Sequence, residues 1–408
     1  MSKIHNLLYE STTSAANSQG RPDLLALTRA VNALIYTDLV AVQPTSQPTA
    51  TLFGLRYTNP NKDMTAFTTA TYYGEVGDRS SIPEVAAGAV TQGQRFKFQD
   101  IVFEATKSGS IASADLDGIR QALVDGTIRM QGDTAKTGQY ESANAEIADA
   151  NFTLDRWNMQ VGTRKIKTKL TVELLQDLEH NQMDAQGTVE DMLGTMISED
   201  INKDIIQKLF TVSKRFKIAG VNDSGIVDLT ASTLPSVDVA RSIYHYVCEM
   251  SAAIQKNTSF LASFVLCSSR VKAYLEASGF VNHSDNDLSD GVTRSGLEVY
   301  TDTNALIDYV VVGSVITQDE MDKVGSLFFA PFTESDEAGS VYFVNDVNSL
   351  QPGIMLMTRY ALGVNPYATA EGKDSEQLTA ADDWNNLVGR SDMSYLMGFK
   401  LPELTIAK

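Results

Sequence analysis

The stretch TVEDMLGTMISEDINKDIIQKLFTV, residues 188–212, carries the strongest periodic signal in the chain. Its apolar residues recur every three or four positions, and charged side chains occupy the opposite side. This spacing predicts a helix of about 37 Å, at about 1.5 Å per residue, with one apolar stripe to bury. Such a helix is typical of a scaffold against which a sheet packs. The residues expected in the buried stripe are Val189, Met192, Leu193, Met196, Ile197, Ile201, Ile205 and Leu209.

A strand is expected just before this helix, in KIKTKLTV at 165–172. Its apolar residues alternate onto one face, and lysines occupy the other. Two interpretations of the lysines remain open: a solvated strand face, or an inter-subunit contact with acidic parts of another copy. Exposed ion pairs contribute only ~0–1 kcal/mol each, so a contact of this kind needs many copies to matter. The candidate contact residues are Lys165, Lys167 and Lys169.

Downstream of about residue 221 the pattern alternates between helix and strand. Ser268-Ser269 is a plausible helix cap, and the polar run 282–296 predicts an exposed loop. The turn-forming QPG at 351–353 separates two strands. The expected elements are a helix at 237–255 and strands at 260–267, 298–301, 309–313, 327–331, 341–344, 354–360 and 395–401.

Upstream of the long helix the signals are weaker. Residues 1–23 are polar and predict an extended arm, and a helix is expected from Asp23. Two prolines in QPTSQP, 43–48, indicate an extended connector. Residues 58–160 lack sustained periodicity, which is unusual inside a compact domain, so we expect a β-rich excursion carrying a small inserted subdomain.

Composition restricts the class of protein. The 408 residues suffice for two or three cores. A net charge of −18, from 33 basic and 51 acidic residues, argues against non-specific nucleic-acid binding by a basic surface. Two cysteines do not make a disulfide framework. The sequence shows neither a secretory signal nor an apolar run of about 18 residues, so we expect a soluble protein made in a cytoplasm.

The chemistry of known enzyme motifs is missing from the sequence. No two of the four histidines lie three or four residues apart, and there is no C-x-x-C, phosphate-binding glycine loop or nucleophile elbow. The acidic run at 285–290 lacks the spacing of an EF-hand. We therefore predict no catalytic residues, no metal site and no cofactor.

Several separated segments resemble the major capsid protein of T-even-type tailed phages. In that family a basic strand leads into an E-L-x-Q-D-L helix start, as VGTRK to ELLQDL does at 161–178. The family pattern E-I/D-N-x-x-I/V is matched by EDINKDII at 199–206. The block LQPGIMLMTRYALGVNPY at 350–367 resembles F-Q-P-x-I-x-x-x-T-R-Y-x-x-x-x-N-P-F/Y. Residues 39–55 carry V-Q-P-x-S-x-P-T-x-x-x-F, and LFFAPF at 327–332 is similar to L-F-Y-x-P-Y.

The resemblance implies an α+β fold of the Hong Kong 97 type. It implies an N-terminal arm, an extended loop that overlaps a neighbouring subunit, a peripheral domain built on the long spine helix, and an axial domain at the centre of each capsomer. The implied boundaries are 1–55 for the arm and first helix, 56–165 for the extended loop with its insertion, 166–220 for the peripheral domain with the spine helix, 221–340 for the axial domain, and 341–408 for the peripheral strand pair and C-terminal segment.

The resemblance also implies that the chain could be processed by a protease. Family members are commonly trimmed after an Ile/Leu-x-Glu sequence, and Leu8-Tyr9-Glu10 fits, as do sequences ending at Glu84, Glu199 and Glu403. Cleavage after Glu10 is one hypothesis. The sequence starting at Met1 argues against trimming, and because the family's long pre-segment is missing, a separate scaffold or none is expected to guide assembly.

The function implied is that of a major capsid protein and not an enzyme. Copies are expected to assemble into hexamers and pentamers of an icosahedral or elongated head that encloses double-stranded DNA without binding it specifically. The expected partners are other copies, a portal, and scaffold and decoration proteins, with no membrane; the location is the virion, assembled in the host bacterial cytoplasm. Two alternatives remain open: the shell of an encapsulin-like bacterial compartment, and an enzyme of unrecognised type.

Overall fold

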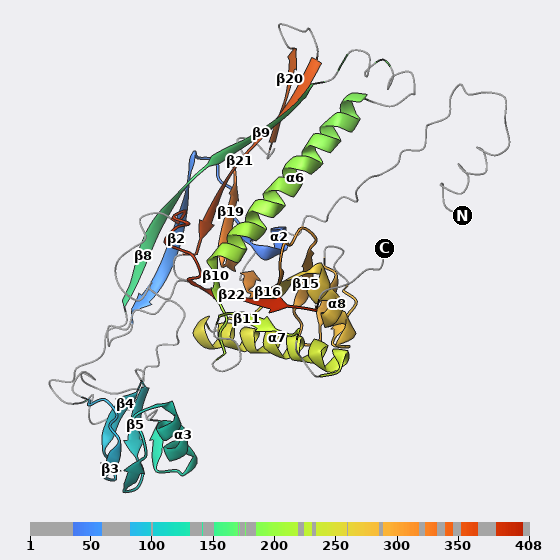
Figure 1. Cartoon of the computed structure of the whole chain (residues 1–408). Helices are drawn as coiled ribbons and strands as arrows, with labels where there is room; N and C mark the ends of the chain where they lie inside the picture. Colours follow the sequence, from blue (N-terminus) through green and yellow to red (C-terminus); the bar gives the residue numbers. More distant parts are fainter. Residues whose placement is uncertain are drawn as a thin grey trace. The chain divides into compact units, whose positions relative to one another are not determined.

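The structure is a computed structural model of the chain (Figure 1), and its contacts divide the chain into two units. Unit 1 comprises residues 1–52, 157–369 and 378–408, and unit 2 comprises 53–156 and 370–377. The residues described are 36–58, 82–98, 101–130, 141, 151–169, 171, 176, 185–218, 224–230, 234–258, 260–284, 289–317, 323–332, 339–345, 352–365 and 381–402.

The predicted long helix is α6, Ala185–Val212, and it is the longest helix among the described residues. It packs against β21 (Pro352–Val364), β9 (Gly162–Lys169) and β22 (Ser391–Lys400). Five of its buried residues lie four positions apart and form one stripe along the helix, and Asn202, Ile206 and Val212 are buried as well. That stripe consists of Leu193, Ile197, Ile201, Ile205 and Leu209.

Two methionines predicted for the stripe lie outside it. Met192 is 53% exposed and Met196 is 48% exposed. Each precedes a stripe residue by one position, which is about 100° around a helix, so each points away from the buried side. The prediction of burial is wrong for these two side chains, while the side chain of Val189 lies outside the described residues.

A five-stranded sheet packs on α6, and β21 is its central strand. One edge of β21 pairs antiparallel with β9, from Gly353 opposite Lys169 to Tyr360 opposite Gly162. The other edge pairs antiparallel with β20 and then with β19, and β19 pairs parallel with β1. The remaining bounds are β1, Ala41–Val42, β19, Leu327–Pro331, and β20, Gly339–Asn345.

An eight-stranded sheet forms the second layer of unit 1. Its strand order is β10-β22-β16-β12-β15-β14-β13, and β11 also pairs with β22. The bounds are β10, Ser213–Arg215, β11, Ile226–Asp228, β12, Phe264–Ser268, β13, Val281–Asn282, β14, Gly291–Thr293, β15, Glu298–Asp302, and β16, Asp308–Gly313.

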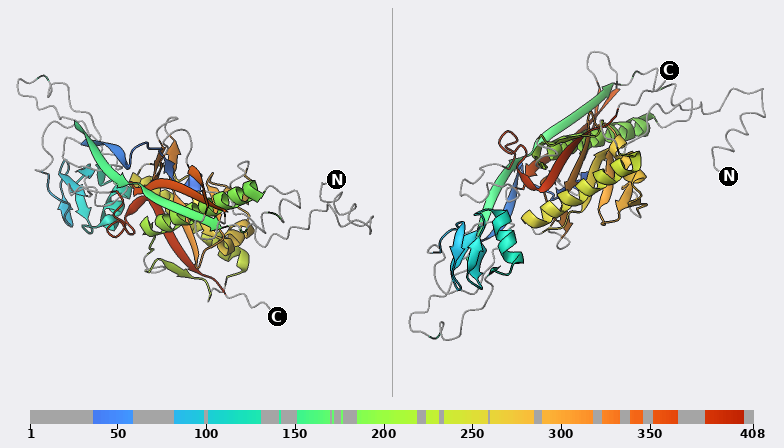
Figure 2. Two further views of the ribbon diagram at one scale, coloured as in Figure 1. Left: turned by 90° about the horizontal axis from the view of Figure 1, so that it is seen from above. Right: turned by 60° about the horizontal axis from the view of Figure 1, so that its bottom comes forward.

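The two faces of this sheet bury different neighbours. Along β12, Phe264 and Leu266 enter the core that contains α6, whereas Val265 and Cys267 enter the core beneath α7. Helices α7 (Ser236–Thr258) and α8 (Ser269–Ala277) lie on one side and α6 on the other (Figure 2). The run of five buried residues in β12 follows from cover on both faces. Ser268 caps α8, as predicted, and its hydroxyl accepts from the amide of Val271.

The strands of the two sheets do not divide at residue 340, where the sequence analysis placed a domain boundary. Strand β19 lies in the five-stranded sheet although it precedes that boundary, and β22 lies inside the eight-stranded sheet although it follows it. The predicted loop 282–296 contains β14, which pairs with β13 and β15. Pairing between segments distant in sequence leaves no local signal, so these assignments needed the structure.

Unit 2 contains a small inserted body with its own core. It contains helix α3, Leu116–Val124, and the carboxylate of the cap residue Asp115 accepts from the amide of Gly118 at 2.9 Å. Hydrogen bonds from Ser113 and Gly118 lower the pKa of Asp115. The strands are β3, Gly88–Val90, β4, Arg95–Phe98, β5, Ile101–Ala105, β6, Gly109–Ile111, and β7, Ile128–Met130.

A two-stranded ribbon has its first strand residues in unit 1 and continues into unit 2. It consists of β2, Thr49–Thr58, and β8, Asn151–Gln160. At its unit 1 end, Leu52, Trp157 and Met159 pack against Ala330 and Ala361 of the five-stranded sheet. Strands β17, Val315–Thr317, and β18, Lys323–Gly325, form a separate two-stranded sheet. Helix α2 is short and spans Tyr36–Leu39.

Burial along α6 predicts a difference between two alanine substitutions on the same helix. Ile205→Ala removes a side chain that is 0% exposed, and it should lower the free energy of unfolding by about 2–5 kcal/mol. Met196→Ala is the matched control and should cost less than about 0.5 kcal/mol in the unassembled subunit. Denaturant unfolding followed by circular dichroism measures both, and equal losses would contradict the one-sided packing of α6.

Candidate functional site

Strand β9 presents two different faces. Arg164 reaches two carboxylates of α6, and Ile166 packs against Leu193 of that helix. Because side chains alternate along a strand, Lys165 and Lys167 project from the opposite face, and both are exposed. The sheet therefore has an inner face, which packs on α6, and an outer face.

On the inner face, Arg164 is the centre of a polar network. Its guanidinium lies 3.3 Å from a carboxylate oxygen of Asp204 and 3.5 Å from one of Asp200. Its Nε donates to the hydroxyl of Tyr360 at 2.7 Å, and that hydroxyl donates to Asp204 at 2.9 Å. Three elements, β9, β21 and α6, are joined by these four side chains.

The environment of this network fixes its protonation states. Burial, followed by the charge of Asp204, raises the pKa of Tyr360 to about 12, so the phenol keeps its proton. Burial acts to lower the pKa of Arg164, but Tyr360 and the two carboxylates outweigh it and raise that pKa above its ordinary value. The network is therefore a permanent structural link at neutral pH.

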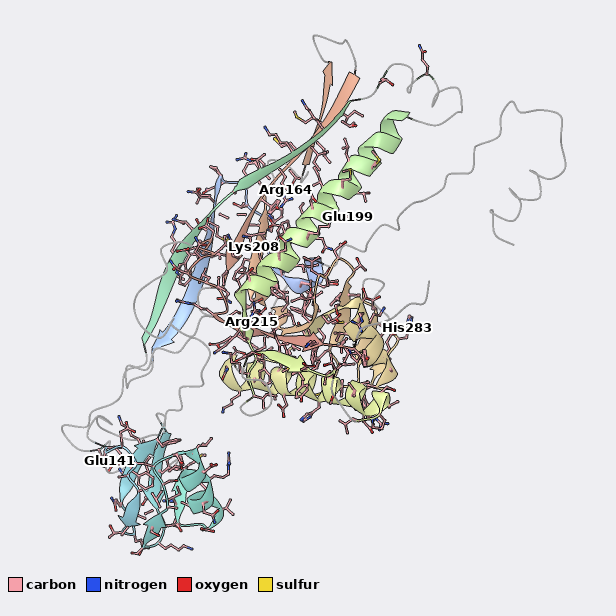
Figure 3. The ribbon with its side chains drawn as sticks, in the orientation of Figure 1. Glu141, Arg164, Glu199, Lys208, Arg215 and His283 are labelled. Carbon is pink, nitrogen blue, oxygen red and sulfur yellow. The ribbon has the colours of Figure 1, made fainter. Side chains whose placement is uncertain are left out.

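A cleft of about 270 Å³ opens beside the network, where β8 continues into β9. Figure 3 labels Arg164 and Lys208 on this side of α6. The ammonium of Lys208 lies 4.2 Å from the ring centroid of Trp384, within range of a cation–π interaction. The residues that line the cleft are Gln160, Gly162, Thr163, Arg164, Asp204, Lys208, Tyr360, Leu362, Asp382 and Trp384.

The outer face alternates cationic and thioether side chains between neighbouring strands. Lys165 is paired in register with Met357, and Lys167 with Met355, and both methionines are half-buried. Arg359, on the same face, lies 4.3 Å from the ring centroid of Phe332. Lys169 continues the series in β9, but its side chain lies outside the described residues. We call Lys165, Lys167, Met355 and Met357 the outer patch.

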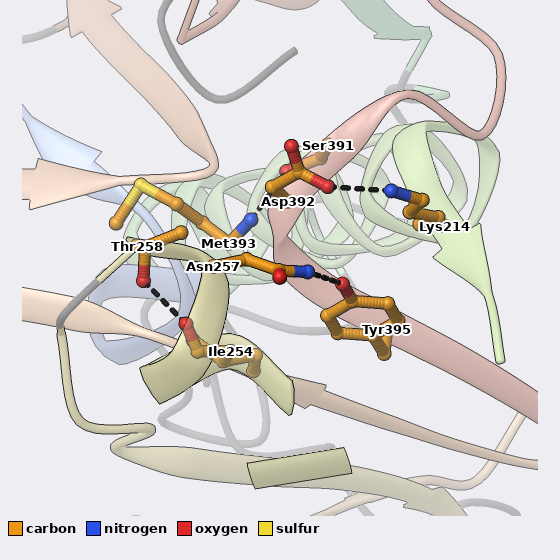
Figure 4. A network of polar contacts seen from close by, with 8 residues as sticks. All are labelled: Lys214, Ile254, Asn257, Thr258, Ser391, Asp392, Met393 and Tyr395. Carbon is orange, nitrogen blue, oxygen red and sulfur yellow. Dashed lines mark hydrogen bonds and ion pairs between the residues drawn. The ribbon is translucent and has the colours of Figure 1, made fainter. Parts of the chain in front are cut away.

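A second network joins α6 to the eight-stranded sheet (Figure 4). Directly after the helix, Ser213 lies 3.0 Å from the hydroxyl of Ser394, and Lys214 forms an ion pair of 2.7 Å with Asp392. The amide of Asn257 on α7 donates to the hydroxyl of Tyr395. Burial acts to lower the pKa of Lys214, but Asp392 outweighs it and raises it. These contacts fix the end of α6 to β22.

No group of three or more His, Cys, Asp or Glu side chains in the part of the chain that the structure describes is arranged to hold a metal ion. Asp290, from the acidic run singled out in the sequence, forms an ion pair of 2.9 Å with Lys272. Among the described residues, no helix is long and apolar enough to cross a membrane.

The structure describes some of the site residues predicted from the sequence and not others. Lys165 and Lys167 are exposed on one face, as their alternation predicts, but whether they contact another subunit is not tested by a single chain. Glu10, the candidate cleavage position, lies outside the described residues. Sequence reasoning missed Lys208 and Trp384, which are distant in sequence and carry no motif.

Comparison with known proteins places this architecture among the proteins that build virus shells. The family model described as "Major capsid protein Gp23" matches residues 17–399. The chain belongs to this family of tailed-phage capsid proteins. It is therefore a structural protein of the phage capsid and a component of the virion.

Individual relatives fall into two groups. The chain is 44% identical to the capsid vertex protein of Enterobacteria phage T4, over 100% of both chains. It is 24% identical to the capsid vertex protein of Vibrio phage KVP40, over 94% of this chain and 97% of that one. It is 23% identical to the major capsid protein of phage T4, over 87% of this chain but 77% of that one.

Solved structures give a weaker likeness. The capsid of Ralstonia phage GP4 matches with a TM-score of 0.49 and 8% identity, over 96% of this chain and 100% of that chain. The capsid of Myoviridae phage XM1 matches with a TM-score of 0.44 and 9% identity, over 95% and 100%.

These findings decide several predictions. The α+β class is confirmed by the observed helices and sheets, and the Hong Kong 97-type capsid fold follows from membership in the family. The prediction of a capsid protein that assembles into phage shells is confirmed. The alternative of an encapsulin-like compartment finds no support among the relatives.

The raised pKa of Tyr360 predicts a pH dependence of stability. Its folded-state value of about 12 exceeds the ordinary 10.0, so its contribution is full below pH 10 and is lost as the pH rises towards 12. Tyr360→Phe should lack this loss, which amounts to about 1–3 kcal/mol in the parent. Unfolding of parent and variant at several pH values between about 9 and 12 measures it.

Tyr246→Phe, on α7 and away from the network, is the matched control and should keep the pH dependence of the parent. Parallel pH profiles for the parent and Tyr360→Phe would show that Tyr360 does not hold its proton more tightly in the folded chain.

Proposed function

We propose that this chain forms the fivefold vertices of a phage head, as pentamers inserted into a shell of a separate major capsid protein. The supporting observation is the pattern of identity: 44% over the full length of a capsid vertex protein, against 22–23% with major capsid proteins, of which it spans 77–80%. The sequence alone suggested hexamers and pentamers; the proposal narrows this to pentamers.

The two layers of unit 1 correspond to the two domains that the proposed function requires. The five-stranded sheet with α6 would serve as the peripheral domain, and the eight-stranded sheet with α7 and α8 as the axial domain. The ribbon of β2 and β8 with the inserted body would serve as the extended loop. In this arrangement the axial domain includes β22, which the sequence-based boundary assigned elsewhere.

Rigidity of α6 suits a shell subunit. The Arg164 network ties the helix to the five-stranded sheet, and the contacts of Ser213 and Lys214 tie its end to the eight-stranded sheet. A closed ring requires each copy to keep a fixed angle between the surfaces it offers to its two neighbours. Two independent links along one helix restrict changes in that angle.

The outer patch is the surface we propose for a contact between subunits. Lysine stems and methionine side chains are apolar and adaptable, while the ammonium groups favour an acidic partner. With 51 acidic and 33 basic residues, another copy offers such a partner. Lys169, next in the alternation, is included in the proposal.

Other roles follow from the family and from the charge of the chain. A net charge of −18 disfavours adhesion to packaged DNA, so the subunit would enclose DNA without binding it specifically. A portal, a scaffold and decoration proteins are the partners expected for such a shell. We assign the chain no catalytic role.

The vertex assignment predicts the position of the chain in a shell. Co-expression with the major capsid protein of the same phage should give particles with density for this chain at the fivefold positions, resolved by electron cryo-microscopy. Particles made without it should lack that density, and expression alone should give pentamers by sedimentation. Density for this chain at sixfold positions would contradict the assignment.

The outer patch predicts a charge-dependent contact. The double variant Lys165→Glu/Lys167→Glu should weaken association by about tenfold per interface, because each reversal replaces an attraction with a repulsion of up to ~1 kcal/mol. Sedimentation at low and high salt measures this, and salt should narrow the difference. Lys256→Glu, on the exposed surface of α7, is the control for added negative charge. An equal loss in the control would assign the effect to net charge.

A further inference from the structure

Lys208 is the cation in the cleft beside α6 that lacks an acidic partner. Among the described residues, no carboxylate oxygen lies within 4.0 Å of its ammonium, the limit for an ion pair. Its position is nevertheless set, because the ammonium lies 4.2 Å from the ring centroid of Trp384. Trp384 is itself half-buried against the core around α6.

The acids that line the cleft are already engaged. Asp204 accepts from the hydroxyl of Tyr360 and pairs with Arg164. An oxygen of Asp382 lies 3.3 Å from the backbone nitrogen of Gln160, which donates to it. Arg164 contacts two carboxylates and the phenol. Among the described residues of the lining, Lys208 is therefore the cation without an ion pair, and Asp382 is the acid without one.

The cleft has room for a side chain. Its volume of about 270 Å³ equals that of about nine waters at ~30 Å³ each. An aspartate or glutamate side chain fits this volume with water to spare. A carboxylate placed there would meet an ammonium whose other side rests on an aromatic face, in surroundings drier than open solvent.

We propose that this cleft receives an aspartate or glutamate side chain from a second copy of the chain, which forms an ion pair with Lys208. The inference rests on the proposed pentamer only in requiring that copies touch. Contacts in a ring are heterologous, so a cleft on one copy faces a different surface of the next. That surface belongs to a chain with 18 more acidic than basic residues, and a cation already held in place offsets its repulsion.

The test is a zero-length cross-link in the assembled protein. Copies grown on ¹⁴N and on ¹⁵N are mixed in equal amounts before assembly and treated with a water-soluble carbodiimide, which joins an amine to a carboxylate in direct contact. Mass spectrometry should find Lys208 joined to an Asp or Glu peptide, with about half of the pairs of mixed isotope. Mixed pairs arise only between copies.

Two variants on the same helix sharpen the result. Lys208→Gln should remove the cross-link and weaken association by about tenfold per interface. Lys203→Gln, five positions earlier on α6, should change association less than twofold. Trp384→Phe keeps an aromatic ring and should retain the mixed-isotope cross-link at reduced yield.

Three outcomes would overturn the proposal. Lys208 joined only to Asp204 or Asp382 in pairs of a single isotope would mean that its partner lies within one chain. Acetylation of Lys208 at equal rates in free subunits and assembled particles would mean that the cleft stays open. Cross-links solely to a different capsid protein would assign the cleft to another partner. If copies assemble other than as vertex pentamers, the isotope test still applies to those particles, so the two proposals fail separately.

Discussion

The packing of α6 against two sheets at once is the constraint on which unit 1 depends. Its buried stripe belongs to the same core as residues of the five-stranded sheet, such as Leu362, and of the eight-stranded sheet, such as Leu396. Each step of four residues along that stripe advances about 40° around the helix, so the stripe turns from one side of the helix towards the other between Leu193 and Leu209. The helix determines how far apart the two sheets lie and which faces they turn to each other.

The basic residues near α6 fall into two groups: those paired with acids of the same chain and those without such a pair among the described residues. Arg164 on β9 and Lys214 on β10 are each paired with acids of their own chain. Lys165, Lys167 and Lys208 differ, because no ion pair within the described residues involves them. These three lysines belong to the two surfaces that we propose for contacts between copies.

The helices and most strands could be predicted from patterns of neighbouring residues. The period of α6, the alternation in β9 and the cap at Ser268 are all written in neighbouring residues, and each was predicted. The exposure of Met192 and Met196 was not predicted, because periodicity of three or four admits a wider stripe than the helix uses. The cleft lay beyond sequence reasoning altogether: Lys208 and Trp384 meet only because β22 brings the preceding loop back to α6.

The place of β22 in its sheet has a consequence for the order of events in the cell. Residues 391–400 lie between β16 on one edge and β10 and β11 on the other, so β10 and β11 have no place in the sheet until residues 391–400 are present. Synthesis runs from the N-terminus, and α6, α7 and β12 leave the ribosome first. The chain therefore cannot complete its second layer while residue 400 is still unmade.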